Sequence, residues 1–78
     1  MRGISLHRYA DLDAATALAV PSPRHGEDRL LVLGLIEGVL HAAVTLDRGA
    51  DIHVISLRRA SRRERQRYTQ WLAARAPR

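Results

Sequence analysis

Arginine side chains gather near the C-terminal end of this 78-residue chain. Residues 58–78 contain eight arginines and one acidic residue, a net charge of +7, whereas residues 1–57 carry a net charge of −2. Guanidinium groups bind phosphate oxygens, and the outward-pointing N–H groups at a helix N-terminus add to that attraction. The sequence therefore predicts a partner that carries phosphate groups or an acidic protein surface. Six of these arginines surround Glu64 and precede Tyr68: Arg58, Arg59, Arg62, Arg63, Arg65 and Arg67.

Histidines are the other side chains that can do chemistry, because imidazole ordinarily titrates near neutrality. They show no metal-ligand spacing and the chain has no cysteine, so neither a metal nor a cofactor is expected. The strand pattern allows His41 and His53 to share one face of adjacent strands. A surface or sheet-face role is the stronger interpretation for all four: His7, His25, His41 and His53.

Length and composition limit the class of protein. One domain spanning residues 1–78 is expected, with a small core and marginal stability. The longest apolar run, Leu30–Ile36, is far shorter than the roughly 20 residues that span a bilayer. Asp11 and Asp13 stand where a signal peptide would be apolar. We therefore expect a cytoplasmic protein with no membrane partner.

The N-terminal part of the chain predicts short elements. Ser5 can cap a short helix over about Leu6–Leu12, which Asp13 closes. Residues 15–20 either continue this helix or form a short edge strand, and the prolines that follow stop both. A polar loop, Pro21–Asp28, comes next.

Three strand-like runs occupy the middle of the chain. Leu30–Ile36 leads through Glu37-Gly38, a tight hairpin signal, into Val39–Leu46. Asp47–Ala50 makes the next turn, and Asp51–Leu57 is the third strand. Such short connections predict antiparallel strands that pair in sequence order.

A helix is predicted to end the chain. Ser61-Arg62-Arg63-Glu64 matches the capping-box pattern, and the helix should run to about Arg75. Its helical periodicity places Tyr68, Trp71 and Leu72 on the packed face and the arginines along the margins. The predicted fold class is α+β: a small antiparallel sheet of three main strands, with a short N-terminal helix and an arginine-rich C-terminal helix on one face.

Five segments, taken in order, carry a family resemblance. They are Arg2–Leu6, Gly26–Arg29, Gly34, Arg48-Gly49, and Ile55–Ser61 followed by Glu64 and Tyr68. They resemble the BrnT family of ribonuclease toxins from bacterial type II toxin–antitoxin systems. That family has Lys-His-Gly-Ile-Ser-Phe, Gly-Glu-x-Arg and Ile-Ser-Ala-Arg-Arg-Ala-Thr-x-x-Glu-x-x-x-Tyr at the first, second and last segments. The resemblance covers about residues 2–70. Such proteins normally open with an additional strand and helix, and this chain starts at what would be the end of that helix. We expect either a start placed too late or a shortened relative that lacks these two elements.

The resemblance implies a RelE-like fold and cleavage of RNA, which inhibits translation and growth. It also implies a cognate BrnA-type antitoxin that neutralises the toxin, with promoter DNA bound only through the antitoxin complex.

RNA cleavage without a metal needs a base for the 2′-hydroxyl, an acid for the leaving 5′-oxygen and positive charge at the phosphorane. Arginine cannot exchange protons near neutral pH, so Arg58 and Arg59 can only bind and stabilise charge. Glu64 and Tyr68 complete the candidate catalytic set, although capping and core packing are structural alternatives for them. The candidate RNA-binding residues are Arg62, Arg63, Arg65 and Arg67.

Two other functions compete with an RNA-cleaving toxin. A shortened, inactive relative would keep only the ability to bind the antitoxin or nucleic acid. A small regulator would bind nucleic acid directly through the arginine-rich helix, but that helix has no helix–turn partner before it, which argues against a helix-turn-helix.

Overall fold

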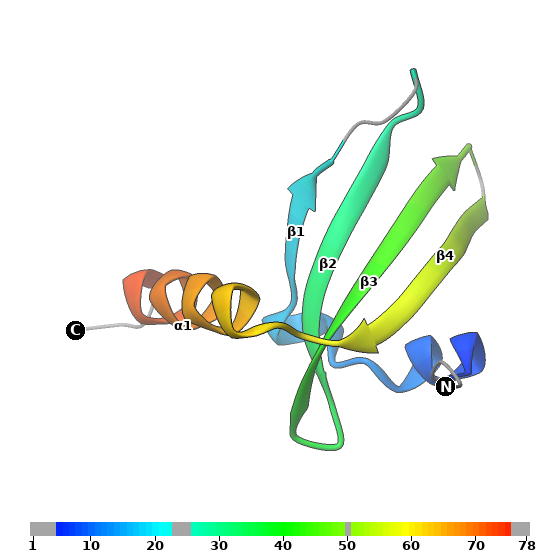
Figure 1. Cartoon of the computed structure of the whole chain (residues 1–78). Helices are drawn as coiled ribbons and strands as arrows, with labels where there is room; N and C mark the ends of the chain where they lie inside the picture. Colours follow the sequence, from blue (N-terminus) through cyan, green and yellow to red (C-terminus); the bar gives the residue numbers. More distant parts are fainter. Residues whose placement is uncertain (1–4, 23–25, 50, 76–78) are drawn as a thin grey trace.

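Three long antiparallel strands pair in sequence order at the centre of the computed structural model, which describes residues 5–22, 26–49 and 51–75. They are β2 (Arg29–Ile36), β3 (Val39–Arg48) and β4 (Asp51–Arg59). The predicted meander is therefore confirmed. A fourth strand, β1 (Leu18–Pro21), pairs with β2 and gives the order β1-β2-β3-β4 (Figure 1). Of the two predictions for residues 15–20, the edge strand is thus the better one.

The two hairpin turns have the backbone that their sequences predict. Glu37 and Gly38 have φ angles of 51° and 78°, the left-handed pair that a two-residue turn between twisted strands requires. Gly49 supplies a φ of 70° between β3 and β4. Parts of the predicted segments lie outside the described residues, namely Arg2–Ile4, Pro23–His25 and Ala50.

The N-terminal helix is not α-helical but consists of two short 3-10 helices, η1 (Leu6–Asp11) and η2 (Ala14–Thr16). The Ser5 hydroxyl caps η1 as predicted, accepting from the His7 N–H at 3.3 Å. Asp13 does not close this helix but caps η2, because its carboxylate accepts from the Ala15 N–H at 3.2 Å. The three residues of η2 are a usual length for a 3-10 helix, whereas the six residues of η1 are more than usual.

The helices do not share one face of the sheet, and this prediction is wrong. Strands β2 and β3 are apolar at successive positions, so both of their faces need a cover. Figure 1 shows α1 (Arg62–Arg75) projecting away from one side of the sheet, while η1 lies beside β4 on the other. On the η1 face, the core is Val32, Ile36, Ala43 and Leu57 with Tyr9, Leu12, Ala17 and Leu30. On the α1 face, it is Leu33, Ala42 and Tyr68 with Leu18, Leu31, Leu40 and Trp71.

Gly34 in β2 allows the N-terminal segment to approach the sheet closely. A Cβ atom at this position would lie 2.5 Å from Leu12 Cδ2 and 2.8 Å from Leu12 Cγ. The Leu12 side chain therefore occupies the space that any other residue would need. This contact explains the glycine within an otherwise apolar strand.

A β-bulge in β4 changes which side chains share a face. Ser56 lies opposite Val44 and Val54 lies opposite Thr45, so Ile55 has no residue opposite it. Beyond such an extra residue, side chains switch to the other face. His53 therefore lies opposite Leu46, on the α1 face, whereas His41 lies on the η1 face. The predicted shared face of His41 and His53 is wrong for this reason.

The C-terminal helix has the predicted length but packs through fewer side chains than predicted. Tyr68 is 5% exposed, and Trp71 is half-buried with its ring centroid 5.8 Å from that of Tyr68. Leu72, by contrast, is 37% exposed and is not a packing residue. The Arg75 guanidinium lies 4.8 Å from the Trp71 ring centroid, a cation–π contact that covers the outer side of the ring.

Candidate functional site

The arginine corner, which we define as the six arginines between residues 58 and 67, lies where β4 passes into α1. The chain stays beside β3 as it leaves the sheet, because the Ala60 N–H donates to the Leu40 carbonyl at 3.1 Å. Ser61 then caps α1. Its hydroxyl accepts from the Glu64 N–H at 3.2 Å, and Glu64 Oε1 accepts from the Ser61 N–H at 2.8 Å. The predicted capping box is therefore present.

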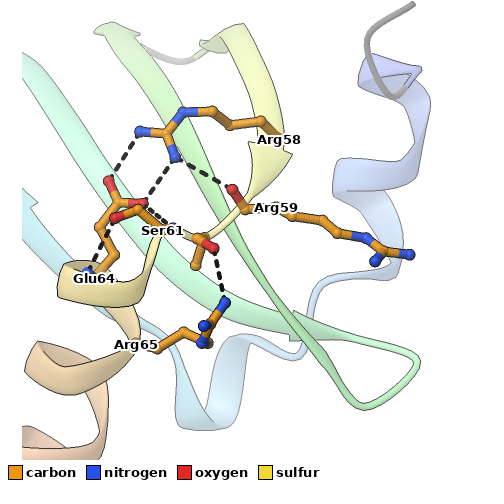
Figure 2. Close-up of polar contacts among 6 residues, drawn as sticks. Arg58, Arg59, Ser61, Glu64 and Arg65 are labelled. Carbon is orange, nitrogen blue, oxygen red and sulfur yellow. Dashed lines mark hydrogen bonds and ion pairs between the residues drawn. The ribbon is translucent and has the colours of Figure 1, made fainter.

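Glu64 also holds Arg58 in a two-point ion pair (Figure 2). Arg58 Nη1 donates to Glu64 Oε1 at 2.8 Å, and Nη2 donates to Oε2 at 2.9 Å. Arg58 Nη1 also donates to the Arg59 carbonyl at 3.2 Å. Both carboxylate oxygens are thus occupied by donors, which tie the end of β4 to the first turn of α1.

This ion pair strongly favours the charged form of both partners. The hydrogen bond from Arg58 lowers the pKa of Glu64 from 4.5 to about 2, and the Ser61 N–H adds to the effect. The same hydrogen bond raises the pKa of Arg58. A carboxylate with so low a pKa is a weak base, so these contacts favour the structural role of Glu64. Its assignment to catalysis stays a prediction.

The Glu64 ion pair should make the stability of the protein fall in acid. The folded-state pKa of Glu64 is about 2 and the ordinary value is 4.5, so the pair stabilises fully above about pH 4.5 and progressively less toward pH 2. We expect about 1–2 kcal/mol, because Arg58 is more than half exposed and solvent screens the pair. Urea unfolding of the wild type and of Glu64→Gln between these pH values measures the contribution. An equal loss of stability in both proteins on acidification would contradict it.

Arg58 and Arg59 point to opposite faces of the sheet. Arg58 lies opposite Ala42 on the α1 face, and Arg59 lies opposite His41 on the η1 face. Figure 2 shows the Arg59 side chain extending away from the Arg58–Glu64 pair toward η1. The two guanidinium groups therefore do not meet at one point, as a single phosphate site would require.

Tyr68 has a structural partner for its hydroxyl. The side chain packs against Leu33 and Ala42, and the hydroxyl donates to the Thr16 carbonyl at 2.7 Å. This bond joins α1 to the end of η2, 52 residues earlier in the chain. A hydroxyl that is buried and already donating is poorly placed to meet a substrate, and its catalytic assignment also stays a prediction.

The remaining arginines of the corner are exposed on α1. Arg65 Nη1 donates to the Ala60 carbonyl at 3.3 Å and so supports the turn between β4 and α1 (Figure 2). No ion pair holds the other three within the described part of the chain, and each presents its charge to solvent: Arg62, Arg63 and Arg67. This surface can contact several phosphate groups of an extended polyanion.

Arg59 and His41 lie directly opposite each other in β4 and β3, and the sequence did not predict this pairing. The available signal was the short turn at Gly49, since counting back from a hairpin turn gives the register of the two strands. The bulge at Ile55 shifts that count by one residue, so the register follows only from the folded sheet.

Comparison with protein families assigns the chain to a class. A model of the family described as ribonuclease toxin, BrnT, of type II toxin–antitoxin system matches residues 1–64 of the 78. The protein belongs to this family. Comparison with curated proteins and with solved structures gave no significant match. The RelE-like fold that the resemblance implies therefore stays a prediction. Within the described residues, no helix is long and apolar enough to cross a membrane.

Proposed function

We propose that this protein is a metal-independent endoribonuclease that inhibits translation and growth, and that a cognate antitoxin of the BrnA type neutralises it. Two observations together support the proposal. The chain matches the BrnT family, and exposed arginines follow the last strand of its sheet. Because RNA is the substrate, the proposal places this activity in the cytoplasm. Promoter DNA would be contacted only through the antitoxin complex.

In this proposal the arginine corner binds the RNA backbone. Arg62, Arg63 and Arg67 are exposed and free to contact phosphates, whereas the Arg65 side chain is turned back to the Ala60 carbonyl. Arg58, Arg59, Glu64 and Tyr68 remain the catalytic candidates from the sequence. Among them, Arg59 is the one whose side chain forms no hydrogen bond or ion pair within the described residues.

The β4 edge of the sheet is suited to binding an antitoxin. β4 is the last strand in the sheet order, so one side of its backbone has no neighbouring strand in the described chain. Ile52 is 64% exposed there, and Ile55 at the bulge is also exposed. An edge strand with exposed apolar side chains is suited to pairing with another protein.

A second function has one observation in its favour. Glu64 and Tyr68 are both engaged in structural contacts, which is the arrangement expected of a relative that binds RNA or the antitoxin without cutting RNA. One measurement distinguishes the two functions: the ribonuclease produces RNA fragments, and the binding protein does not.

Cleavage of synthetic RNA by the purified protein in the presence of EDTA tests the proposal. We expect fragments that the antitoxin suppresses when added in equal amount, and growth arrest when the protein is expressed alone. Fluorescence anisotropy with the same RNA provides the matched measurement of binding. Intact RNA together with clear binding would reject the ribonuclease in favour of the binding module.

A further inference from the structure

A cleft on the η1 face of the sheet brings Arg59 of the arginine corner beside His41. It has a volume of about 220 Å³ and lies between η1, the turn joining β2 to β3, and the end of β4. A phosphodiester group fits a space of this size. The residues that line it are Arg8, Ile36, Glu37, Val39, His41 and Arg59.

His41 in this cleft has a defined protonation pattern. Its Nδ1 atom lies 2.8 Å from the Val39 carbonyl, and a carbonyl oxygen can only accept a hydrogen bond. Nδ1 therefore carries the proton, and in a neutral ring Nε2 has the free lone pair. The hydrogen bond also fixes the orientation of the ring, which is a requirement for a proton acceptor.

The Nε2 atom of His41 remains accessible although the residue is only 7% exposed. Within the described residues this atom has no hydrogen-bond partner, and none of the fully buried side-chain nitrogen and oxygen atoms there lacks one. Nε2 must therefore reach solvent. Because His41 lines the cleft, we infer that the cleft is where it does so.

The two arginines that line the cleft differ in their carboxylate partners. Arg8 is balanced by carboxylates, with Nε 3.2 Å from Asp11 Oδ2 and Nη2 3.4 Å from Glu37 Oε1. Arg59 lies opposite His41 and forms no ion pair within the described residues. Arg59 is therefore the arginine of the lining that is available to a phosphodiester oxygen.

We propose that this cleft binds a phosphodiester of RNA against Arg59, and that His41 Nε2 is the base that accepts the 2′-hydroxyl proton. The second part rests on the proposed ribonuclease function. The 2′-oxygen forms a bond to phosphorus, and the bond from phosphorus to the 5′-oxygen breaks. The leaving 5′-oxygen takes a proton from water, and the resulting hydroxide is neutralised by the His41 imidazolium. The products are a 2′,3′-cyclic phosphate and a 5′-hydroxyl.

Binding is tested without cleavage by titrating the protein with a dinucleotide whose attacking 2′-oxygen is methylated. We expect the ring resonances of His41 in a nitrogen–proton NMR spectrum to shift with saturation, while those of His53 do not. Arg59→Gln should weaken this binding at least about tenfold, because a charge-assisted hydrogen bond is lost. Arg75→Gln, which alters an arginine on the far side of the fold, is the matched control.

Cleavage is tested with His41→Asn, because the asparagine amide can still donate to the Val39 carbonyl while Nε2 is removed. We expect the cleavage rate to fall about 100-fold or more, the usual contribution of a general base, with the thermal transition nearly unchanged. The rise of the wild-type rate with pH should be lost as well. The charged groups that line the cleft with His41 are Arg8, Glu37 and Arg59. His53→Asn is the control and should cleave like the wild type.

The outcomes separate this inference from the proposed function. Unshifted His41 resonances in the dinucleotide titration would overturn the phosphate site and need no variant of His41. A wild-type rate in folded His41→Asn would overturn the role of His41 as a base while leaving the ribonuclease intact. Shifted resonances in a wild type that never cleaves RNA would overturn the ribonuclease and support the phosphate site alone.

Discussion

Tyr68→Ala should remove a large part of the stability of the protein. A buried aromatic side chain truncated to alanine typically costs about 3–5 kcal/mol, and a domain of this length has only about 4–12 kcal/mol in total. Tyr68 is also the one buried residue of α1, so the helix would lose its main contact with Leu33 and Ala42. Urea unfolding followed by circular dichroism measures the loss. A change below about 1 kcal/mol would show that α1 does not depend on this contact.

Tyr68→Phe is the matched control, because it removes only the hydroxyl that donates to Thr16. The expected loss is about 1–2 kcal/mol, since one hydrogen bond is lost and a carbonyl loses its partner. The same variant decides the catalytic assignment. If Tyr68→Phe folds and cleaves RNA at the wild-type rate, the hydroxyl is structural; if it folds and does not cleave, the hydroxyl takes part in the reaction.

The triple variant Arg62→Gln, Arg63→Gln, Arg67→Gln should greatly weaken RNA binding with little effect on stability. The three side chains are exposed and form no ion pair in the described chain, so their removal should leave the fold intact. Each phosphate contact to single-stranded RNA adds about 0.7 to the slope of log affinity against log salt concentration. Losing three contacts should therefore reduce that slope by about 2. Anisotropy titrations with one RNA at several salt concentrations measure it.

The corresponding triple lysine variant controls for charge alone. Lysine keeps the positive charge but not the two-point geometry of the guanidinium group. We expect it to keep most of the salt dependence, because counterion release depends on charge. An unchanged slope in the glutamine variant would mean that RNA contacts the protein elsewhere, and the arginine corner would then lose its assigned role.

The structure gives the six arginines of the corner different tasks. Arg58 is committed to Glu64 and Arg65 supports the turn before α1, so both help to build the corner. Arg62, Arg63 and Arg67 are exposed on α1 and are the proposed RNA contacts, and Arg59 lines the cleft on the other face. Neutralising all six together would therefore mix folding with binding. Variants grouped by task avoid that confusion.

Local signals in the sequence determined most of the secondary structure. The Ser61–Glu64 capping box, the Glu37-Gly38 turn and the start of η1 at Ser5 were all predicted correctly. Each depends on contacts between residues no more than a few positions apart, and such contacts can be read from residue type and spacing. The clustering of arginine around residue 60 was visible for the same reason.

Only the tertiary structure decided which face each functional side chain occupies. The sequence placed Arg58 and Arg59 together as neighbours, but alternation along β4 sends them to opposite faces. It grouped His41 with His53, and the bulge at Ile55 separated them while the hairpin register set His41 opposite Arg59. The physical reason is that strand register, bulges and burial result from contacts across the sheet. A one-residue shift in such contacts moves every following side chain to the other face.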